Sequence, residues 1–269
     1  MIDSPNGWLA LPGRLLIHFI RYLGQLGFLV SEIVNSFLLD KLRLKLVAQQ
    51  IVSIGYGSQI VVIVTGAFTG AVFTFQTYAK FKDFGVESSV GAIVSVALCR
   101  ELGPVLAGLM VAGRVGAAMA ADIGTMKVTE QVDALRAMSV SPVGYLVVPR
   151  FVAMMISMPL LIAESITFGL LASYAVAVFG FGVPHAWFVN HLFAHTNMED
   201  LCIGMIKGFF FGVLITVISC HEGLAAKDGA VGVGQGTTRA VVLSSLVLLI
   251  LNFFLSVLLN YFFPLGTGI

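Results

Sequence analysis

The sequence predicts an all-α protein that crosses a membrane several times. Of its 269 residues, 58% are hydrophobic and 11% are charged, whereas charged residues make up roughly 25% of a soluble globular domain. Several nearly uncharged stretches exceed the ~18 residues that indicate a membrane-spanning helix. This composition excludes a soluble enzyme, and a net charge of +1 gives no electrostatic basis for binding nucleic acid. The 3 cysteines form no CxxC pair, which excludes a disulfide framework and a zinc site.

Residues 1–45 predict an amphipathic helix followed by a basic flank at residues 41–45. Apolar side chains fill one helical stripe of residues 14–39. Polar side chains recur at helical spacing on the opposite stripe: Arg14, His18, Arg21, Gln25 and Glu32. A helix with arginine on its wet face tends to lie in the membrane interface. We therefore expect an interfacial helix, with a crossing helix as the alternative.

Five membrane-spanning helices are expected in residues 46–269. They lie at about 51–79, 89–121, 143–180, 201–220 and 240–263. The stretch 181–200 and the glycine-rich stretch 221–239 are expected to be connections. Gly103-Pro104 predicts a kink or a break in the second span, because proline removes a backbone donor. The spacing of Gly66 and Gly70 predicts close packing against another helix.

A short amphipathic helix is expected at about 126–138, between the second and third spans. Thr129 is a candidate cap for its start. Its apolar face would consist of Val128, Val132, Leu135 and Met138. Its polar side chains would be Lys127, Glu130, Gln131, Asp133 and Arg136. An exposed apolar face on so short a helix needs a groove on a partner protein or the bilayer surface to cover it.

The basic residues predict the orientation in the membrane. Most lysines and arginines of the connections fall on the side that holds residues 1–45 and 126–138. Lys80, Lys82 and Lys207 are assigned to the other side. By the positive-inside rule, the N-terminus is expected in the cytoplasm and the C-terminus outside it.

Charged residues inside the spans are the first candidates for function. A charge at mid-bilayer costs at least ~2.5–3.5 kcal/mol on insertion scales. The adjacent Arg100 and Glu101 are expected to form the polar wall of a substrate cavity; the alternative is an ion pair that only pins the helix. Arg114 is expected to reach the nearby membrane boundary. Glu164 is either a proton site or a hydrogen-bond partner for a neighbouring helix.

Other apparent motifs lack the residues that their chemistry needs. His185, His191 and His195 have no metal-ligand pattern, and residues 221–225 begin like HExxH but end in alanine. The glycine-rich stretch 229–236 lacks the Gly-Lys-Ser/Thr of a phosphate-binding loop. We expect no metal and no cofactor in this chain, so any ATP and Mg²⁺ would be bound by a separate subunit.

Several ordered motifs resemble the MlaE permeases (the YrbE/TRIGALACTOSYLDIACYLGLYCEROL type), over roughly residues 46–263. They are RELGPV at 100–105, AGRVG at 112–116, ADIGTM at 121–126, TEQVDAL at 129–135 and GAVGVG at 229–234, with Thr237-Thr238 and residues 240–242. The resemblance implies a homodimeric permease subunit of an ABC transporter in the bacterial inner membrane. Such a transporter moves phospholipids between that membrane and a periplasmic lipid carrier and maintains outer-membrane lipid asymmetry. The implied partners are an MlaF-like ATPase, an MlaD-like MCE-domain protein and an MlaB-like STAS-domain protein.

The resemblance also implies roles for particular residues. The lipid-binding cavity would be bordered by Arg100, Glu101, Phe73, Gln76, Tyr78, Lys80, Phe81 and Phe84. The helix that couples to the ATPase would use Lys127, Thr129, Glu130, Val132, Asp133, Leu135 and Arg136.

Two positions depart from the family pattern. Asn252 stands where the last span usually carries an aspartate, and Lys80 stands where relatives often have an apolar residue. An alternative function is a proton-coupled secondary transporter that uses Glu101 and Glu164, against which stands the lack of an inverted repeat. A membrane lipid enzyme built on the histidine-rich stretch is a third hypothesis, and it lacks a nucleophile or metal constellation.

Overall fold

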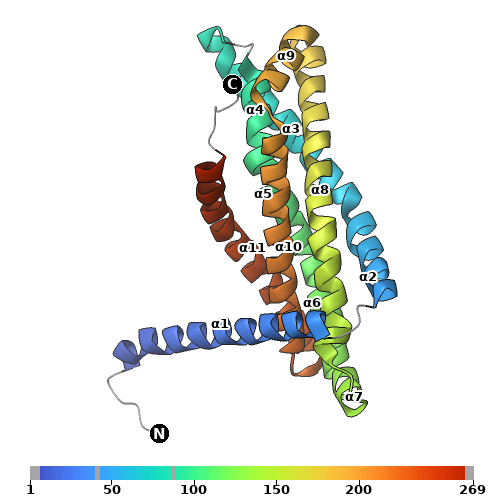
Figure 1. Cartoon of the computed structure of the whole chain (residues 1–269). Helices are drawn as coiled ribbons and strands as arrows, with labels where there is room; N and C mark the ends of the chain where they lie inside the picture. The colour runs from blue at the N-terminus through green and yellow to red at the C-terminus, as the bar shows by residue number, and fades with distance from the viewer. Residues whose placement is uncertain (1–6, 40–42, 87–88, 264–269) are drawn as a thin grey trace.

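The computed structural model describes residues 7–39, 43–86 and 89–263, and every element in these ranges is a helix (Figure 1). Within them, five helical runs are long and apolar enough to cross a membrane: Leu44–Phe84, Val90–Val128, Val143–Gly180, Met198–Leu224 and Gly229–Phe262. The runs lie side by side as an elongated bundle. The predicted class, an all-α multi-pass membrane protein, is confirmed.

The first three spans contain π-helical turns as well as α-helix. The first comprises α2 (Leu44–Ile51), η1 (Val52–Tyr56) and α3 (Gly57–Phe84). The second comprises α4 (Val90–Ala97), η3 (Leu98–Leu102), α5 (Gly103–Val111), η4 (Ala112–Gly116) and α6 (Ala117–Val128), and is followed by the short α7 (Gln131–Ala137). The third comprises η5 (Val143–Val147), α8 (Val148–Ala175) and η6 (Val176–Gly180), and is followed by α9 (His185–His195). The last two are α10 (Met198–Leu224) and α11 (Gly229–Phe262).

The second span does not break at Pro104. The helix stays continuous, and the π-helical turn η3 directly precedes the proline at the start of α5. A π-helical turn is the usual way to accommodate a local irregularity inside a helix, and such turns are frequent at functional sites. The sequence irregularity therefore appears as a widened turn, and that turn holds Arg100 and Glu101.

Two stretches expected to be connections are largely helical. The 185–195 stretch forms α9, where the buried Phe188 packs with Ala177 and Val183. The glycine-rich stretch belongs mostly to α11, which begins at Gly229, so only a short turn separates α10 from α11. Glycine has a low intrinsic helix propensity, and here tertiary packing overrides it.

Glycines allow the first and third spans to approach closely. A Cβ atom at Gly66 would collide with the Ser165 carbonyl oxygen, and one at Gly70 would collide with that of Gly169. The predicted close packing of this glycine pair is thus confirmed, with α8 as the partner helix. Further along the same contact, the Thr74 hydroxyl donates to Ser173 Oγ at 2.6 Å.

Helix α1 (Gly7–Leu39) lies across one end of the bundle (Figure 1) and is not among the five candidate spans. Its side chains Leu29 and Ile33 are buried against Val143 and Val217 of the bundle. Much of the remaining apolar surface of α1 is exposed, as expected for an interfacial helix. The side chains of Arg14 and His18, and all of Lys41, lie outside the described residues.

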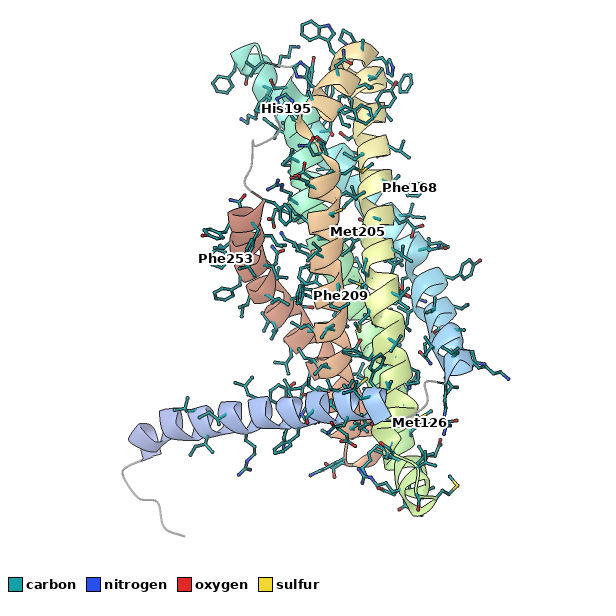
Figure 2. All side chains as sticks on the ribbon, viewed as in Figure 1. Met126, Phe168, His195, Met205, Phe209 and Phe253 are labelled. Carbon is teal, nitrogen blue, oxygen red and sulfur yellow. The ribbon has the colours of Figure 1, made fainter. Side chains whose placement is uncertain are left out.

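The outer faces of the spans are apolar. Phe168 on α8 and Phe253 on α11 project outward (Figure 2), with 37% and 64% of their surface exposed. The bundle interior is built from small and branched side chains, including Val62, Ala107 and Ile162. Such a surface suits a lipid solvent, in which apolar side chains need not be hidden.

Candidate functional site

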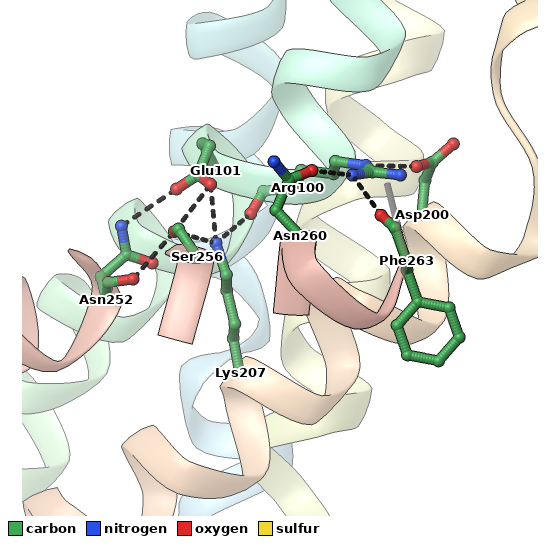
Figure 3. A network of polar contacts seen from close by, with 8 residues as sticks. All are labelled: Arg100, Glu101, Asp200, Lys207, Asn252, Ser256, Asn260 and Phe263. Atoms are coloured by element: carbon green, nitrogen blue, oxygen red, sulfur yellow. Dashed lines mark hydrogen bonds and ion pairs between the residues drawn. The ribbon is translucent and has the colours of Figure 1, made fainter. Parts of the chain in front are cut away.

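Arg100 and Glu101 lie on η3, and each forms an ion pair with a different residue of α10 (Figure 3). Arg100 Nε lies 2.5 Å from Asp200 Oδ1. Glu101 Oε1 lies 2.8 Å from Lys207 Nζ. Both residues thus form intramolecular ion pairs, as the alternative to a cavity wall requires, so the ion pairs alone do not decide between the two interpretations. They join the second span to the fourth.

Glu101 is the centre of a network that also reaches α11. Asn252 Nδ2 donates to Glu101 Oε2 at 3.0 Å. The hydroxyl of Ser256 lies 2.8 Å from Glu101 Oε1 and also 2.8 Å from Lys207 Nζ. The carboxylate thus has hydrogen-bond donors from the fourth and fifth spans. Bonds to an ionised group are the strong class of hydrogen bonds, so this network ties three spans together.

Lys207 is buried completely, with 0% of its surface exposed. A buried ammonium is tolerated only when it is paired and its donors are used. Lys207 Nζ has three acceptors: the Arg100 carbonyl oxygen at 2.6 Å, Glu101 Oε1 and Ser256 Oγ. An ammonium has three donors, so its hydrogen-bonding capacity is filled. The sequence places Lys207 near the start of the fourth span and counts it with the basic residues of the outer side, whereas the structure buries it in the network.

Asp200 fixes Arg100 and the start of α10 at the same time. Its Oδ2 accepts the backbone N–H of Asn197 at 2.9 Å, as part of a capping box at the helix start. Its Oδ1 accepts from Arg100, and only 4% of the Asp200 side chain is exposed. Arg100 Nη1 also donates to the Phe263 carbonyl oxygen at 3.2 Å and approaches Asn260 Oδ1 at 3.4 Å. The end of α11 is thereby held next to the network.

A pocket of about 340 Å³ opens beside these residues. Its polar wall is formed by Arg100, Glu101, Lys207, Ser256 and Asn260. The other wall is apolar: Val96, Ala97, Ile203, Phe253, Val257 and Leu259. The Glu101 side chain is 45% exposed, so the network is accessible from the pocket. Its charged wall and apolar wall suit a ligand that is itself amphipathic.

The first-span residues assigned to the cavity by resemblance lie elsewhere. Phe73, Tyr78 and Phe81 pack against Val90 and its neighbours on α4. Tyr78 also stacks on Phe181, with ring centroids 4.0 Å apart. Gln76, Lys80 and Phe84 are exposed. The pocket lining includes none of these six side chains, so within one chain the structure brings Arg100 and Glu101 together with α10 and α11 and not with the end of α3.

The stretch 126–138 is two helices instead of one. Helix α6 ends at Val128, Glu130 adopts a left-handed conformation with φ of 61°, and α7 begins at Gln131. This sharp turn packs α7 back onto α6, and Val132 becomes fully buried. An apolar face of four exposed residues is therefore not present: Leu135 is half-buried, and only Met138, at 65%, is largely exposed.

Charged side chains brace the turn between α6 and α7. Asp133 accepts from Lys127 at 2.9 Å and from Arg136 at 3.1 Å. The hydrogen bond from Lys127, with the added charge of Arg136, lowers the pKa of the Asp133 carboxyl below its usual value. Thr129 does not cap α7, because its hydroxyl donates back to the Thr125 carbonyl oxygen at 2.7 Å.

Comparisons with known proteins identify the family of this chain. The sequence profile of the family described as Permease MlaE matches residues 47–258. The chain belongs to the MlaE permease family. It is 36% identical over 248 residues to the intermembrane phospholipid transport system permease protein MlaE of Haemophilus influenzae, covering 92% of this chain and 95% of that protein.

Other relatives of this MlaE permease come from a second bacterium and from a plant. It is 42% identical over 244 residues to a probable ABC transporter permease protein of Rickettsia felis, covering 91% of this chain and 94% of that protein. It is 35% identical over 240 residues to the chloroplastic protein TRIGALACTOSYLDIACYLGLYCEROL 1 of Arabidopsis thaliana, covering 89% of this chain and 67% of that protein.

The network gives a physical meaning to Asn252, which departs from the family pattern. Its amide nitrogen donates to Glu101. An aspartate at this place would set a second carboxylate beside Glu101, and two neighbouring carboxylates repel each other. Asparagine instead donates a hydrogen bond to the Glu101 carboxylate.

Two further charges of the spans lie outside the network. Arg114 Nη1 donates to Ser58 Oγ at 2.7 Å and so joins the second span to the first. Glu164 is half-buried on α8 and forms no hydrogen bond or ion pair with any described residue. A hydrogen bond from Glu164 to a neighbouring helix is therefore not found in this part of the chain.

Sequence reasoning did not assign Asp200 and Lys207 to the site. A signal was present, because residues seven apart lie on one face of a helix. Both therefore face the second span. The pairing with Arg100 and Glu101 follows from how the helices pack, which the spacing alone does not specify.

Proposed function

We propose that this chain is the membrane subunit of an ABC transporter that moves phospholipids between the bacterial inner membrane and a periplasmic carrier protein. This proposal rests mainly on the pocket between η3, α10 and α11, which has a charged wall on one side and apolar side chains on the other. Membership of the MlaE family and the name of the Haemophilus relative, a phospholipid transport permease, support the same substrate class. The proposal includes the role that the resemblance implies, which is to maintain the lipid asymmetry of the outer membrane.

The lipid head group would lie against the polar wall. Arg100 offers positive charge toward a phosphate, and the buried Lys207 supports the wall through its ion pair with Glu101. Acyl chains would contact Ile203, Phe253 and Val257. Because Arg100 also binds the end of α11, a movement of α11 would change the shape of the pocket and the contacts of the head group together. The first-span residues Phe73, Gln76, Tyr78, Lys80, Phe81 and Phe84 remain a prediction from the resemblance.

A homodimer is part of the proposal. Helix α11 is the least covered span, with 17% of its most apolar window buried. Its exposed side chains include Phe253, Phe254, Val257 and Leu258. A second copy of the chain packed on this face would enclose the pocket, whose α11 wall is otherwise open to lipid.

The remaining partners follow from the same family assignment. The turn that holds α7 would dock on an MlaF-like ATPase, which binds ATP and Mg²⁺, through Leu135, Met138 and the exposed charges. An MlaD-like MCE-domain protein and an MlaB-like STAS-domain protein would complete the transporter. With the N-terminus in the cytoplasm, α7 would face the ATPase and α9 would face the periplasm.

Substitution of Glu101 tests the pocket assignment. Glu101→Gln removes the charge that pairs with Lys207, and Glu199→Gln is the matched control, since Glu199 is an exposed carboxylate at the start of α10. We expect the purified Glu101→Gln transporter to retain about tenfold less phospholipid and to lose lipid transport in proteoliposomes, while Glu199→Gln behaves as wild type. Wild-type lipid retention and transport by Glu101→Gln would contradict the pocket. Transport that continues with ATP hydrolysis blocked, and stops when the proton gradient collapses, would instead favour a secondary transporter.

A further inference from the structure

Glu164 is a charged residue of the spans that the pocket does not use. It lies on α8 and is half-buried. Among the residues that the structure describes, none forms a hydrogen bond or an ion pair with its carboxylate. The charges of Arg100, Glu101, Arg114 and Lys207, in contrast, all have partners within the chain. Glu164 therefore differs from them in having no partner in the described part of the chain.

Glu164 lies far from the membrane surface that the interfacial helix α1 marks. Leu29 of α1 packs with Val143 and Val147 at the start of the third span. Glu164 is 17 residues beyond Val147, which is about 25 Å at 1.5 Å per residue. The hydrocarbon core of a bilayer is about 30 Å thick. The carboxylate therefore lies within the hydrocarbon, in the half away from α1.

A carboxylate at this depth needs a partner. An aspartate at the centre of a membrane helix costs about 2.5–3.5 kcal/mol on insertion scales, and charged residues inside spans usually pair with one another. Thr167, one turn further along α8, does not supply the partner, because its hydroxyl donates to the Ala163 carbonyl oxygen at 2.8 Å. A group from outside the described chain would remove this cost.

The surface around Glu164 has the spacing of a helix-binding face. Exposed apolar side chains lie on both sides of it, at intervals of three or four residues along α8: Ile156, Leu160, Phe168 and Leu171. Residues three and four apart are neighbours on the surface of a helix. Phe168 projects outward from the bundle (Figure 2). These five residues form the α8 face, which combines apolar contacts with one acidic group.

We propose that the α8 face binds a transmembrane helix of another protein that carries an arginine or a lysine at the level of Glu164. The basic side chain pairs with the Glu164 carboxylate, and apolar side chains of the same helix pack on Leu160 and Phe168. Charge complementarity selects this partner, because a wholly apolar helix would leave the carboxylate unpaired. The partner's own charge is equally costly in lipid, so one ion pair removes both costs.

A second copy of this chain is a poor match for the α8 face. A two-fold contact centred on the face would set Glu164 opposite its own copy, and two neighbouring carboxylates repel each other. The homodimer proposed above uses α11, which lies on the other side of the bundle from α8 (Figure 1). The occupant is therefore a different chain.

Synthetic transmembrane helices test the α8 face directly. The probe is a leucine–alanine helix with one arginine in its outer half, and the same helix with leucine at that position is the comparison. The full-length purified chain carries a donor dye on the exposed Cys202. This position is near α8, because Gly204, two residues further along α10, packs on Ile166. Energy transfer to an acceptor dye on the peptide, in phosphatidylcholine vesicles, measures association. We expect the arginine helix to bind about fivefold more tightly than the leucine helix, as polar contacts between membrane helices do.

Substitution of Glu164 should remove this difference. Glu164→Leu should bind the two peptides equally. Glu199→Gln, which changes an exposed carboxylate at the start of α10, is the matched control and should behave as wild type. In the charge-reversed pair, Glu164→Arg should prefer a peptide with glutamate in place of the arginine. A purely structural role of Glu164 would not produce this reversal.

Folding and self-association complete the test. Glu164→Leu should melt at or above the wild-type temperature, because the described part of the chain supplies no partner that it could lose. A lower thermal midpoint would show an internal role and overturn the proposal. Equal binding of the two peptides to the wild-type chain would also overturn it, and so would loss of the homodimer in Glu164→Leu, which would make a second copy the occupant. These measurements involve neither phospholipid transport nor ATP, so their failure would leave the function proposed above unchanged.

Discussion

Lys207 Nζ and Glu101 Oε1 lie 2.8 Å apart, on helices that meet in the interior of the bundle. Only 1% of the Lys207 side chain is exposed, against 45% of that of Glu101. The Lys207 ammonium therefore contacts only protein atoms, whereas the Glu101 carboxylate contacts the lysine and is also exposed to the pocket. This asymmetry makes Glu101 the group that a ligand can contact without removing the support of the buried ammonium.

Lys207→Met should destabilise the protein, because it leaves Glu101 without its ion-pair partner. We expect a loss of about 2 kcal/mol in the free energy of unfolding, below the roughly 3–5 kcal/mol for a fully buried pair, since Glu101 is partly exposed. The thermal midpoint in detergent measures the loss. The double variant Glu101→Gln/Lys207→Met should recover part of it, because neither charge is then alone.

The exposed Lys82, near the end of α3, provides the control as Lys82→Met. If Lys207→Met and Lys82→Met melt at the same temperature, the buried ion pair does not contribute to stability.

Much of the fold could be predicted because the apolar runs are long and uncharged. The third span agrees with its predicted limits. The start of α11 could not be predicted in the same way, because residues 229–236 are rich in glycine and a helix there depends on the close approach of Gly232 to Lys227. The helix propensities of the individual residues do not predict such a contact.

Only those residues of the site that are charged and lie inside an apolar stretch of sequence could be predicted. Arg100 and Glu101 are adjacent charges inside a span, and the cost of burying them indicates a role. The sequence places Lys207 near the outer start of the fourth span, because the apolar run begins at Leu201. The helix starts earlier, at Met198, through the capping box of Asn197 and Asp200, and this places Lys207 about two and a half turns inside the helix.

Two apolar residues of α7 allow its folding and its docking to be tested separately, because Val132 is buried and Leu135 is only half-buried. Val132→Asp places a charge where no surface is exposed, so we expect a large fall in thermal midpoint, equivalent to several kcal/mol. Leu135→Asp lies on the half-buried side and should cost less than about 1 kcal/mol. If α7 docks in a groove of the ATPase, Leu135→Asp should reduce co-purification of the ATPase while the permease stays folded. Unchanged co-purification would exclude Leu135 from the docking surface.

The contact between α3 and α8 depends on the absence of a side chain at Gly70. Gly70→Ala introduces a Cβ atom that collides with the Gly169 carbonyl oxygen. We expect a loss of about 1–3 kcal/mol, the usual range for overpacking, seen as a lower thermal midpoint. Gly113→Ala is the matched control, because no atom lies within 4 Å of its added Cβ. There alanine should be neutral or slightly stabilising, since it favours helix more than glycine does. Equal thermal midpoints for Gly70→Ala and Gly113→Ala would mean that α3 and α8 can move apart without a loss of stability.

Labelling of single cysteines tests the proposed orientation. Met138, 65% exposed after α7, and Phe193, 73% exposed on α9, lie at opposite ends of the bundle. The exposed Cys202 is first replaced by serine, whereas Cys99 and Cys220 are buried. In the proposed orientation, which rests on the positive-inside rule and the basic residues around α7, this helix faces the cytoplasm. A charged thiol reagent added outside intact spheroplasts should therefore label Phe193→Cys and leave Met138→Cys unlabelled until the membrane is opened. The reverse pattern would invert the topology and place the α7 surface on the side where no ATPase can reach it.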